Sequence, residues 1–201
     1  RYQEESHLLA VGEFDAWKGK KVLEIGCGLG TDILQYARGG ADVSGIDLTP
    51  QSIELVKRRF ALYKLKGNFK ESDARKIPFP DSCFDLVYSC GVLHHIPEVE
   101  KVVTEIERVL KPGGRIIILL YNKHSFHHYW HTFFYLGIIK MGLLRHSLND
   151  LIAISTDGVG NPYSKLYTEK EARALFANLA PLQIKKYYVS HIDMFAPFGK
   201  Y

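Results

Sequence analysis

Between residues 21 and 121, short apolar runs alternate with longer stretches in which apolar residues recur at helical spacing. The runs predict β-strands, and the stretches between them predict helices. The predicted strands are Lys21–Ile25, Asp42–Ile46, Asn68–Ser72, Phe84–Ser89, Arg115–Tyr121 and Leu182–Ser190. The predicted helices are Thr31–Arg38, Pro50 to about Leu65, Pro97–Leu110, and one that Thr168 opens and that runs to about Leu179. This alternation is typical of an α/β fold with helices on both faces of a mostly parallel sheet.

Local signals mark the ends of several of these elements. Thr49 followed by Pro50 suits a helix start, and Thr168 with Glu171 three residues later has the pattern of a capping box. The sequence Lys-Pro-Gly-Gly at 111–114 predicts a sharp stop to the helix before it. The residues Arg115–Tyr121 that follow are almost continuously apolar, which predicts a strand covered on both faces.

Length and composition favour a single globular domain over residues 1–201 and exclude a disordered chain. The chain has 201 residues, of which 46% are hydrophobic and 24% charged. Its formal net charge of +4 is spread along the sequence, so no nucleic-acid partner is predicted. Three cysteines without metal-ligand spacing predict reduced thiols and a cytoplasmic protein.

The first predicted strand runs into a glycine-rich turn at Glu24-Ile25-Gly26-Cys27-Gly28-Leu29-Gly30. Such glycines let the backbone approach a ligand closely beside a helix N-terminus. A dinucleotide fingerprint would need its third glycine at position 31, where this chain has Thr31. Taken alone, the turn also fits an ordinary tight connection between a strand and a helix.

A second signal is Asp47, which ends the second predicted strand 21 residues after Gly26. A carboxylate at this place can accept hydrogen bonds from both hydroxyls of a ribose. The alternative is a structural aspartate close to a helix start.

The spacing of Glu24, Gly26, Gly28 and Gly30 closely resembles the E/D-x-G-x-G-x-G motif of class I S-adenosyl-L-methionine-dependent methyltransferases. Further motifs of that family match in the same order, and the resemblance covers roughly Val22 to Tyr121. The matching segments are Ser72-Asp73-Ala74, Asp85-Leu86-Val87-Tyr88-Ser89, Gly91-Val92-Leu93-His94-His95-Ile96 and Leu110-Lys111-Pro112-Gly113-Gly114. The Gly91–Ile96 segment is typical of the branch that methylates small molecules. The resemblance implies a Rossmann-like, doubly wound sheet and S-adenosyl-L-methionine as cofactor.

The same resemblance implies roles for individual residues. Glu24 would hold the methionine amino group directly or through water, and Gly26 and Gly28 would flank the methionine chain. Asp47 would bind the ribose, Asp73 and Ala74 would face the adenine, and Cys90 or Val92 would lie near the sulfonium. Cys27 and Leu48, the chain neighbours of these residues, complete the expected cofactor contacts, although Cys27 also fits a packing role.

Methyl transfer requires mainly in-line placement of the acceptor, because the sulfonium is already activated. A general base is needed only for a hydroxyl, a carbon acid or a protonated amine. The candidates for a catalytic role are His95, Tyr121 and His128, followed by His124 and His191. For His94 and His95, a structural pair at the edge of a helix is an equal alternative.

Residues 122–163 interrupt the α/β alternation and are rich in aromatic residues and histidine. The expected helix would align His124, His127 or His128, and His131, either as a polar stripe or as metal ligands. No acidic residue or cysteine is interleaved, so no metal is predicted. The apolar part, Tyr129–Leu144, is 16 residues long, short of the about 20 needed to span a bilayer. It fits a lid over a hydrophobic acceptor, a helix at a membrane surface, or a dimer contact.

In the resembled family, insertions after the fifth strand commonly build the acceptor site, so residues 122–163 are expected to form a lid or acceptor-site insertion. The predicted function is methyl transfer to a small, apolar or aromatic metabolite. Two alternatives are a cofactor-binding scaffold without catalysis and a nicotinamide-dependent oxidoreductase, which Thr31 disfavours.

Overall fold

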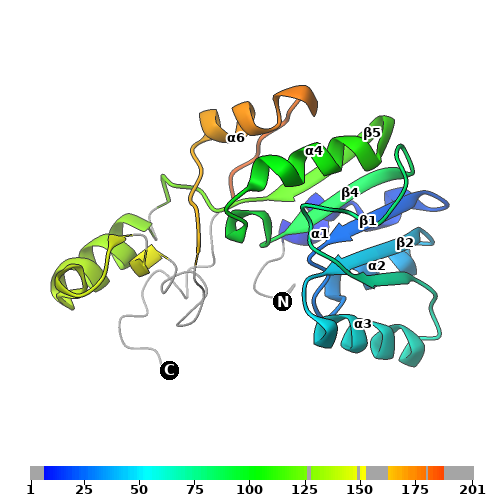
Figure 1. Ribbon diagram of the computed structural model, residues 1–201, viewed down its shortest axis with the longest axis horizontal. Coiled ribbons are helices and arrows are strands. Elements are labelled where there is room, and N and C mark those ends of the chain that lie inside the picture. Colours follow the sequence, from blue (N-terminus) through cyan, green and yellow to red (C-terminus); the bar gives the residue numbers. More distant parts are fainter. Residues whose placement is uncertain (1–6, 126–127, 149, 153–162, 180, 188–201) are drawn as a thin grey trace.

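The computed structural model describes residues 7–125, 128–148, 150–152, 163–179 and 181–187. Its centre is a five-stranded sheet in the order β3-β2-β1-β4-β5, with every neighbouring pair parallel (Figure 1). The strands are β1 Lys21–Ile25, β2 Asp42–Asp47, β3 Asn68–Glu71, β4 Phe84–Cys90 and β5 Leu110–Leu119. This sheet is the Rossmann-like, doubly wound architecture that the sequence predicts.

Helices connect the strands and cover both faces of the sheet. They are α1 His7–Gly12, η1 Phe14–Trp17, α2 Thr31–Arg38, α3 Pro50–Leu62, η2 Leu93–His95, α4 Val99–Val109, η3 His128–Ile139, η4 Gly142–Leu144, α6 Glu169–Leu175 and η5 Ala177–Leu179. Thr49 caps α3 by accepting a hydrogen bond from the Ser52 amide, and Thr168 and Glu171 form the predicted capping box.

Two hydrophobic cores lie on opposite faces because side chains alternate along each strand. In β1, Val22 packs with η1, α2 and α3, whereas Leu23 and Ile25 pack with α4 on the other face. All three are almost completely buried. Consecutive strands therefore carry runs of apolar residues, as expected for a parallel sheet covered on both sides.

Several boundaries differ from the prediction. Helix α3 ends at Leu62, three residues early, and Lys64 then adopts a left-handed conformation. Strand β5 begins at Leu110, which pairs with Phe84 before an irregularity that precedes the pairing of Leu86 with Arg115. The predicted stop at 111–114 is therefore a bulge within the edge strand of the described sheet.

Of two predictions about strands, one is confirmed and one is wrong. β5 is covered on both faces, since Ile116 and Ile118 pack against one core and Ile117 against the other, and these side chains are half-buried at the edge of the described sheet. Residues 182–187 form no strand, and the rest of the predicted segment Leu182–Ser190 lies outside the described residues. Helices α1 and η1 were not predicted, yet Phe14 and Trp17 of η1 are buried in one core.

Beyond β5 the chain leaves the sheet and forms η3 and η4, which pack against each other to one side of the domain (Figure 1). The chain returns beside the end of β5, where the Tyr167 amide donates to the Tyr121 carbonyl at 2.8 Å. Within the described part of the chain, no helix combines the length and apolar character required to cross a membrane.

Candidate functional site

The candidate site lies at the carboxyl ends of the parallel strands. The strand order reverses between β1 and β4, which is where doubly wound sheets open a crevice for ligands. The glycine-rich turn after β1, Asp47 at the end of β2 and Cys90 at the end of β4 all lie at this edge. The topology thus brings together residues that are far apart in the sequence.

Backbone hydrogen bonds fix the turn after β1 against β2. The amides of Gly26 and Cys27 both donate to the Ile46 carbonyl, at 2.8 and 3.0 Å. Gly26 has a φ of 74°, and a Cβ built there would stand 2.3 Å from a methyl carbon of Val92. Gly28 also has positive φ, but nothing lies within 4 Å of its ideal Cβ position. The turn is therefore tightly packed at Gly26 and open at Gly28.

Asp47 holds this turn and the following helix start together. Its Oδ2 accepts from the Gly28 amide at 2.9 Å, and its Oδ1 accepts from both the amide and the hydroxyl of Thr49. The carboxylate is half-buried, and the adjacent Leu48 is an exposed apolar side chain. A carboxylate and an apolar surface thus lie side by side next to the open face of Gly28.

Glu24 lies inside the domain, only 4% exposed. Its Oε2 accepts from the Ile33 amide at 2.9 Å, so the carboxylate caps the first turn of α2. Cys27 is buried against the same strands, and burial raises the pKa of its thiol well above the ordinary value. Cys27 therefore stays protonated and packs, the second of the two roles expected for it.

The structure adds a buried polar pair that the sequence did not indicate. The Tyr88 hydroxyl in β4 donates to Asp32 Oδ2 of α2 at 2.8 Å, and both residues are about 2% exposed or less. Burial raises the pKa of Tyr88, so its hydroxyl remains a donor. The only sequence signal was an acidic residue in the first turn of a helix, which is common at exposed positions.

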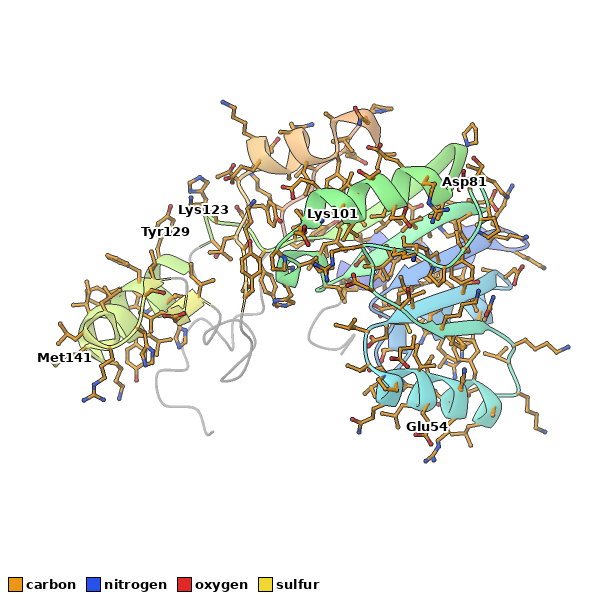
Figure 2. All side chains as sticks on the ribbon, viewed as in Figure 1. Glu54, Asp81, Lys101, Lys123, Tyr129 and Met141 are labelled. Carbon is orange, nitrogen blue, oxygen red and sulfur yellow. The ribbon has the colours of Figure 1, made fainter. Side chains whose placement is uncertain are left out.

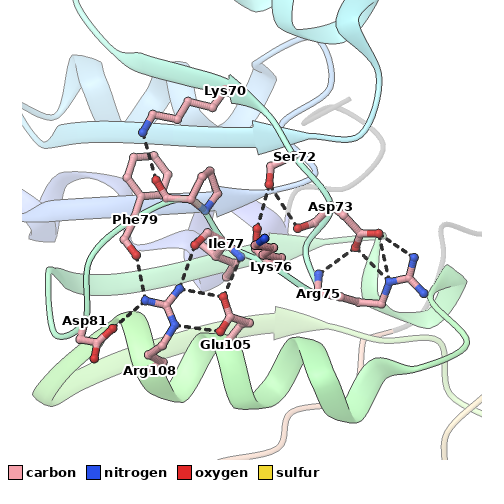
Figure 3. A network of polar contacts seen from close by, with 11 residues as sticks. Lys70, Ser72, Asp73, Arg75, Lys76, Ile77, Phe79, Asp81, Glu105 and Arg108 are labelled. Atoms are coloured by element: carbon pink, nitrogen blue, oxygen red, sulfur yellow. Dashed lines mark hydrogen bonds and ion pairs between the residues drawn. The ribbon is translucent and has the colours of Figure 1, made fainter.

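The connection from β3 to β4 carries Asp73 and Ala74, and a polar network fixes it to α4 (Figure 3). Asp73 accepts from the backbone amide of Arg75 and from its guanidinium, whose hydrogen bonds lower the pKa of the carboxyl. Arg75 also pairs with Glu98 at 2.6 Å. Asp73 thus remains charged while Ala74, 9% exposed, packs into the core beneath it.

Arg108 of α4 fixes the second half of this connection. Its guanidinium donates to the carbonyls of Ile77 and Phe79 and pairs with Asp81 and Glu105, and Glu105 in turn accepts from the Ile77 amide (Figure 3). These bonds satisfy backbone groups that have no partner in a strand or helix.

Replacing Arg108 by alanine is expected to lower the free energy of unfolding by about 1–3 kcal/mol, because two carbonyls and two carboxylates lose a charged donor. Urea denaturation followed by circular dichroism measures the change. Arg58→Ala is the matched control, since the ion pair that the described residues give Arg58 is with Glu54 on the exposed face of α3. This substitution should cost less than about 0.5 kcal/mol. Equal losses in the two variants would contradict the anchoring role of Arg108.

On the β4 side, η2 places two histidines beside Tyr121. His94 is buried, and its ring centroid lies 3.9 Å from that of Tyr121. His95 is half-buried, and its Nδ1 lies 2.9 Å from the Tyr163 carbonyl oxygen. Because a carbonyl only accepts, Nδ1 carries the proton, and Nε2 is the acceptor nitrogen of the neutral ring.

Of the remaining catalytic candidates, the structure describes the side chain of His124 alone. His124 precedes η3 and contacts Tyr129, so the histidines do not share one continuous helix. His128 begins η3, but its side chain lies outside the described residues, as do His127 and His191. Among the described residues, no three histidine, cysteine or acidic side chains are placed to hold a metal ion.

Residues 23–118 match the family described as "Methyltransferase domain". A sterol 4-C-methyltransferase from Caenorhabditis elegans is 41% identical over 98 residues, which cover 48% of this chain and 29% of that protein. A demethylmenaquinone methyltransferase from Renibacterium salmoninarum is 26% identical over 185 residues, covering 87% of this chain and 72% of that protein. The chain thus spans under a third of the first relative and nearly three quarters of the second.

Among solved structures, the YcgJ protein from Bacillus subtilis superposes with a TM-score of 0.65 at 21% sequence identity. The superposition covers 87% of this chain and 67% of that protein. This likeness concerns the fold, and it agrees with the parallel sheet and its order of strands.

Proposed function

We propose that this chain is a class I methyltransferase that transfers a methyl group from S-adenosyl-L-methionine to a small apolar acceptor, since residues 23–118 match the family described as "Methyltransferase domain". The observation that carries the proposal is the open face of Gly28 next to the Asp47 carboxylate at the switch point of the sheet. Backbone open to a ligand and a carboxylate that can accept from hydroxyls are what an adenosine derivative requires there.

The described residues fit this cofactor. Asp47 would accept from the ribose hydroxyls, and Leu48 would offer an apolar surface to the adenine. Gly28 would leave room for the methionine chain, because a side chain at this position would occupy the open space above the turn. Glu24, which caps the start of α2, would bind the methionine amino group directly or through water. When bound, the cofactor supplies an activated methyl group, so the protein needs to contribute mainly placement.

The acceptor is approached from the β4 side, where Cys90, η2 and Tyr121 lie. For an acceptor with an acidic hydroxyl or carbon, His95 is the better base of the two described candidates, because Nε2 of its neutral ring can accept a proton. The ring of Tyr121 lies against that of His94 and so positions His94 and His95. The relatives named above act on a sterol and a demethylmenaquinone, and we infer a lipid-like acceptor of that apolar kind.

Cys27, Cys83 and Cys90 are reduced cysteines in the part of the chain that the structure describes. Free thiols suit a reducing compartment, which supports a cytoplasmic location for the enzyme.

The direct test incubates the chain with S-adenosyl-L-methionine carrying a labelled methyl group and a panel of quinols, sterols and fatty acids. Label should enter a lipid-soluble product, and the His95→Gln variant should bind the cofactor normally but transfer more slowly. Cofactor binding without transfer to any lipid or aqueous extract would favour the scaffold alternative. Binding of a nicotinamide dinucleotide instead would favour an oxidoreductase.

Asp73→Asn should weaken binding of S-adenosyl-L-methionine about tenfold, because an amide can turn its NH₂ group toward the donor on the adenine. Arg75→Gln is the matched control, since it removes the same clamp on Asp73 but leaves the carboxylate. Calorimetric titration of both variants should show the larger loss for Asp73→Asn. If Arg75→Gln loses as much affinity, Asp73 acts by fixing the loop and not by binding adenine.

A further inference from the structure

The described residues 128–148, here called the arm, expose an unusual amount of apolar surface. Of seventeen large apolar side chains that are exposed in the described residues, ten belong to the arm. They are Tyr129, Trp130, Phe133, Phe134, Ile138, Ile139, Met141, Leu143, Leu144 and Leu148. Figure 2 shows Met141 at the end of the arm that lies far from the sheet. An apolar surface of this extent on a folded protein marks a site of contact with a partner or a membrane.

The elements of the arm pack against each other, so a lack of internal packing is not the cause of the exposure. Thr132 is 1% exposed on the inner side of η3, and Gly137 lies close enough to Leu143 that a Cβ would contact it at 3.2 Å. Gly142 likewise packs against Leu136 and Leu151. The two glycines allow η3 and η4 to pack together. Of the ten apolar side chains, Leu143 takes part in this contact and is still 41% exposed.

Charge gives the arm a second distinctive property. No aspartate or glutamate occurs from residue 108 to residue 149, whereas the arm carries Lys140 and Arg145. Both basic residues are exposed, and Lys140 lies over the ring of Tyr135 with its Nζ 5.7 Å from the ring centroid. Lys123 adds a third exposed positive charge where the chain enters the arm. The arm is therefore both apolar and net positive, and the first carboxylate after it is that of Asp150, which accepts from the amide and hydroxyl of Ser147.

We propose that the arm docks on the surface of an anionic lipid bilayer, with its aromatic and aliphatic side chains in the interface and its basic residues among the headgroups. Tryptophan and tyrosine favour this boundary because each has an apolar ring and a polar tip. Lysine and arginine next to them add electrostatic attraction to anionic lipid. The η3 helix has 12 residues, so it lies on the membrane and does not cross it.

Charge also argues against a second copy of the chain as the occupant. A symmetric contact would place the positive surface of one arm against that of the other, with no acidic residue in either arm to compensate. A lid over a small acceptor would use only part of the apolar surface, since the ten side chains extend over both η3 and η4. Docking on a bilayer accommodates the whole surface, and it would give the site access to a lipid-like acceptor.

The test is flotation of the full chain with vesicles of phosphatidylcholine alone or with about a third phosphatidylglycerol. The wild-type chain should float with the anionic vesicles, and added salt should reduce the bound fraction. The double variant Lys140→Gln and Arg145→Gln should bind about tenfold or more weakly. Lys57→Gln with Lys66→Gln on the far side of the sheet is the matched control, because it changes the net charge equally.

A second pair of variants tests the apolar contribution. Phe133→Ser with Phe134→Ser should abolish flotation. Leu62→Ser with Tyr63→Ser removes two apolar side chains at the end of α3 that are more exposed than the two phenylalanines, and it should leave flotation unchanged. Circular dichroism confirms that each variant is folded. Failure of the wild-type chain to float, or equal flotation of arm and control variants, would overturn the proposal. So would a wild-type dimer that the arm variants dissociate while vesicle binding is absent.

Discussion

Replacing Asp47 by alanine is expected to weaken binding of S-adenosyl-L-methionine about ten- to a hundredfold in a chain that still folds. Hydrogen bonds to a charged group contribute about 1.5–3 kcal/mol, and the role proposed for this carboxylate is to accept from the ribose hydroxyls. The substitution also removes the acceptor for the Gly28 amide and for Thr49, so the turn that lies beneath the cofactor loses its main support. Calorimetric titration measures the change in Kd.

Asp42→Ala is the matched control for this variant. Asp42 is the same residue type at the opposite end of the same strand, exposed and far from the carboxyl edge. Its substitution should leave the affinity unchanged. Unaltered cofactor affinity in a folded Asp47→Ala chain would rule out the ribose assignment.

Gly26→Ala should destabilise the fold by about 2–5 kcal/mol, the largest effect on stability that we expect from a single methyl group. A left-handed backbone costs a residue with a Cβ about 1–2 kcal/mol, and Gly26 has a φ of 74°. The new Cβ would also stand 2.3 Å from Val92, and crowding of this kind costs about 1–3 kcal/mol. Urea denaturation gives the change in the free energy of unfolding.

Two further variants separate these causes. Gly19 has a similar φ of 70° with nothing within 4 Å, so Gly19→Ala should show the backbone cost alone. Adding Val92→Ala to Gly26→Ala removes the Val92 methyl groups that the new Cβ would meet. The double variant should therefore recover part of the lost free energy of unfolding, which would appear as a positive coupling between the two sites. A Gly26→Ala chain as stable as Gly19→Ala would contradict the close approach of β1 and Val92.

The regular part of the fold could be predicted from hydrophobic spacing and caps. Lys21–Ile25 and Thr31–Arg38 have the predicted bounds, because an apolar run followed by a glycine turn and an amphipathic stretch leaves few alternatives. The short helices α1 and η1 have too few residues to show a period. The start of β5 was misjudged because proline and glycine usually end an element, whereas an edge strand tolerates them at a bulge.

In the candidate site too, residues that belong to a motif could be predicted, whereas residues that only the folded structure brings together could not. Spacing from Gly26 placed Asp47 correctly at the end of β2, and the roles of Glu24, Asp73 and Cys90 stay predictions. The Asp32–Tyr88 pair and the Arg108 network join residues that lie 56 and about 30 positions apart, and nothing in their own surroundings in the sequence marks them. The contacts of Gly137 with Leu143 and of Gly142 with Leu136, which join η3 and η4, were not revealed by the sequence pattern.

The central claim is that the carboxyl edge of this sheet binds S-adenosyl-L-methionine. Calorimetric titration of the wild-type chain with S-adenosyl-L-methionine, its demethylated product and a nicotinamide dinucleotide tests it most directly. We predict saturable binding of one molecule of either methionine derivative per chain, competition between the two, and no binding of the dinucleotide. Binding of the dinucleotide alone, or of none of the three by a folded chain, would contradict the account.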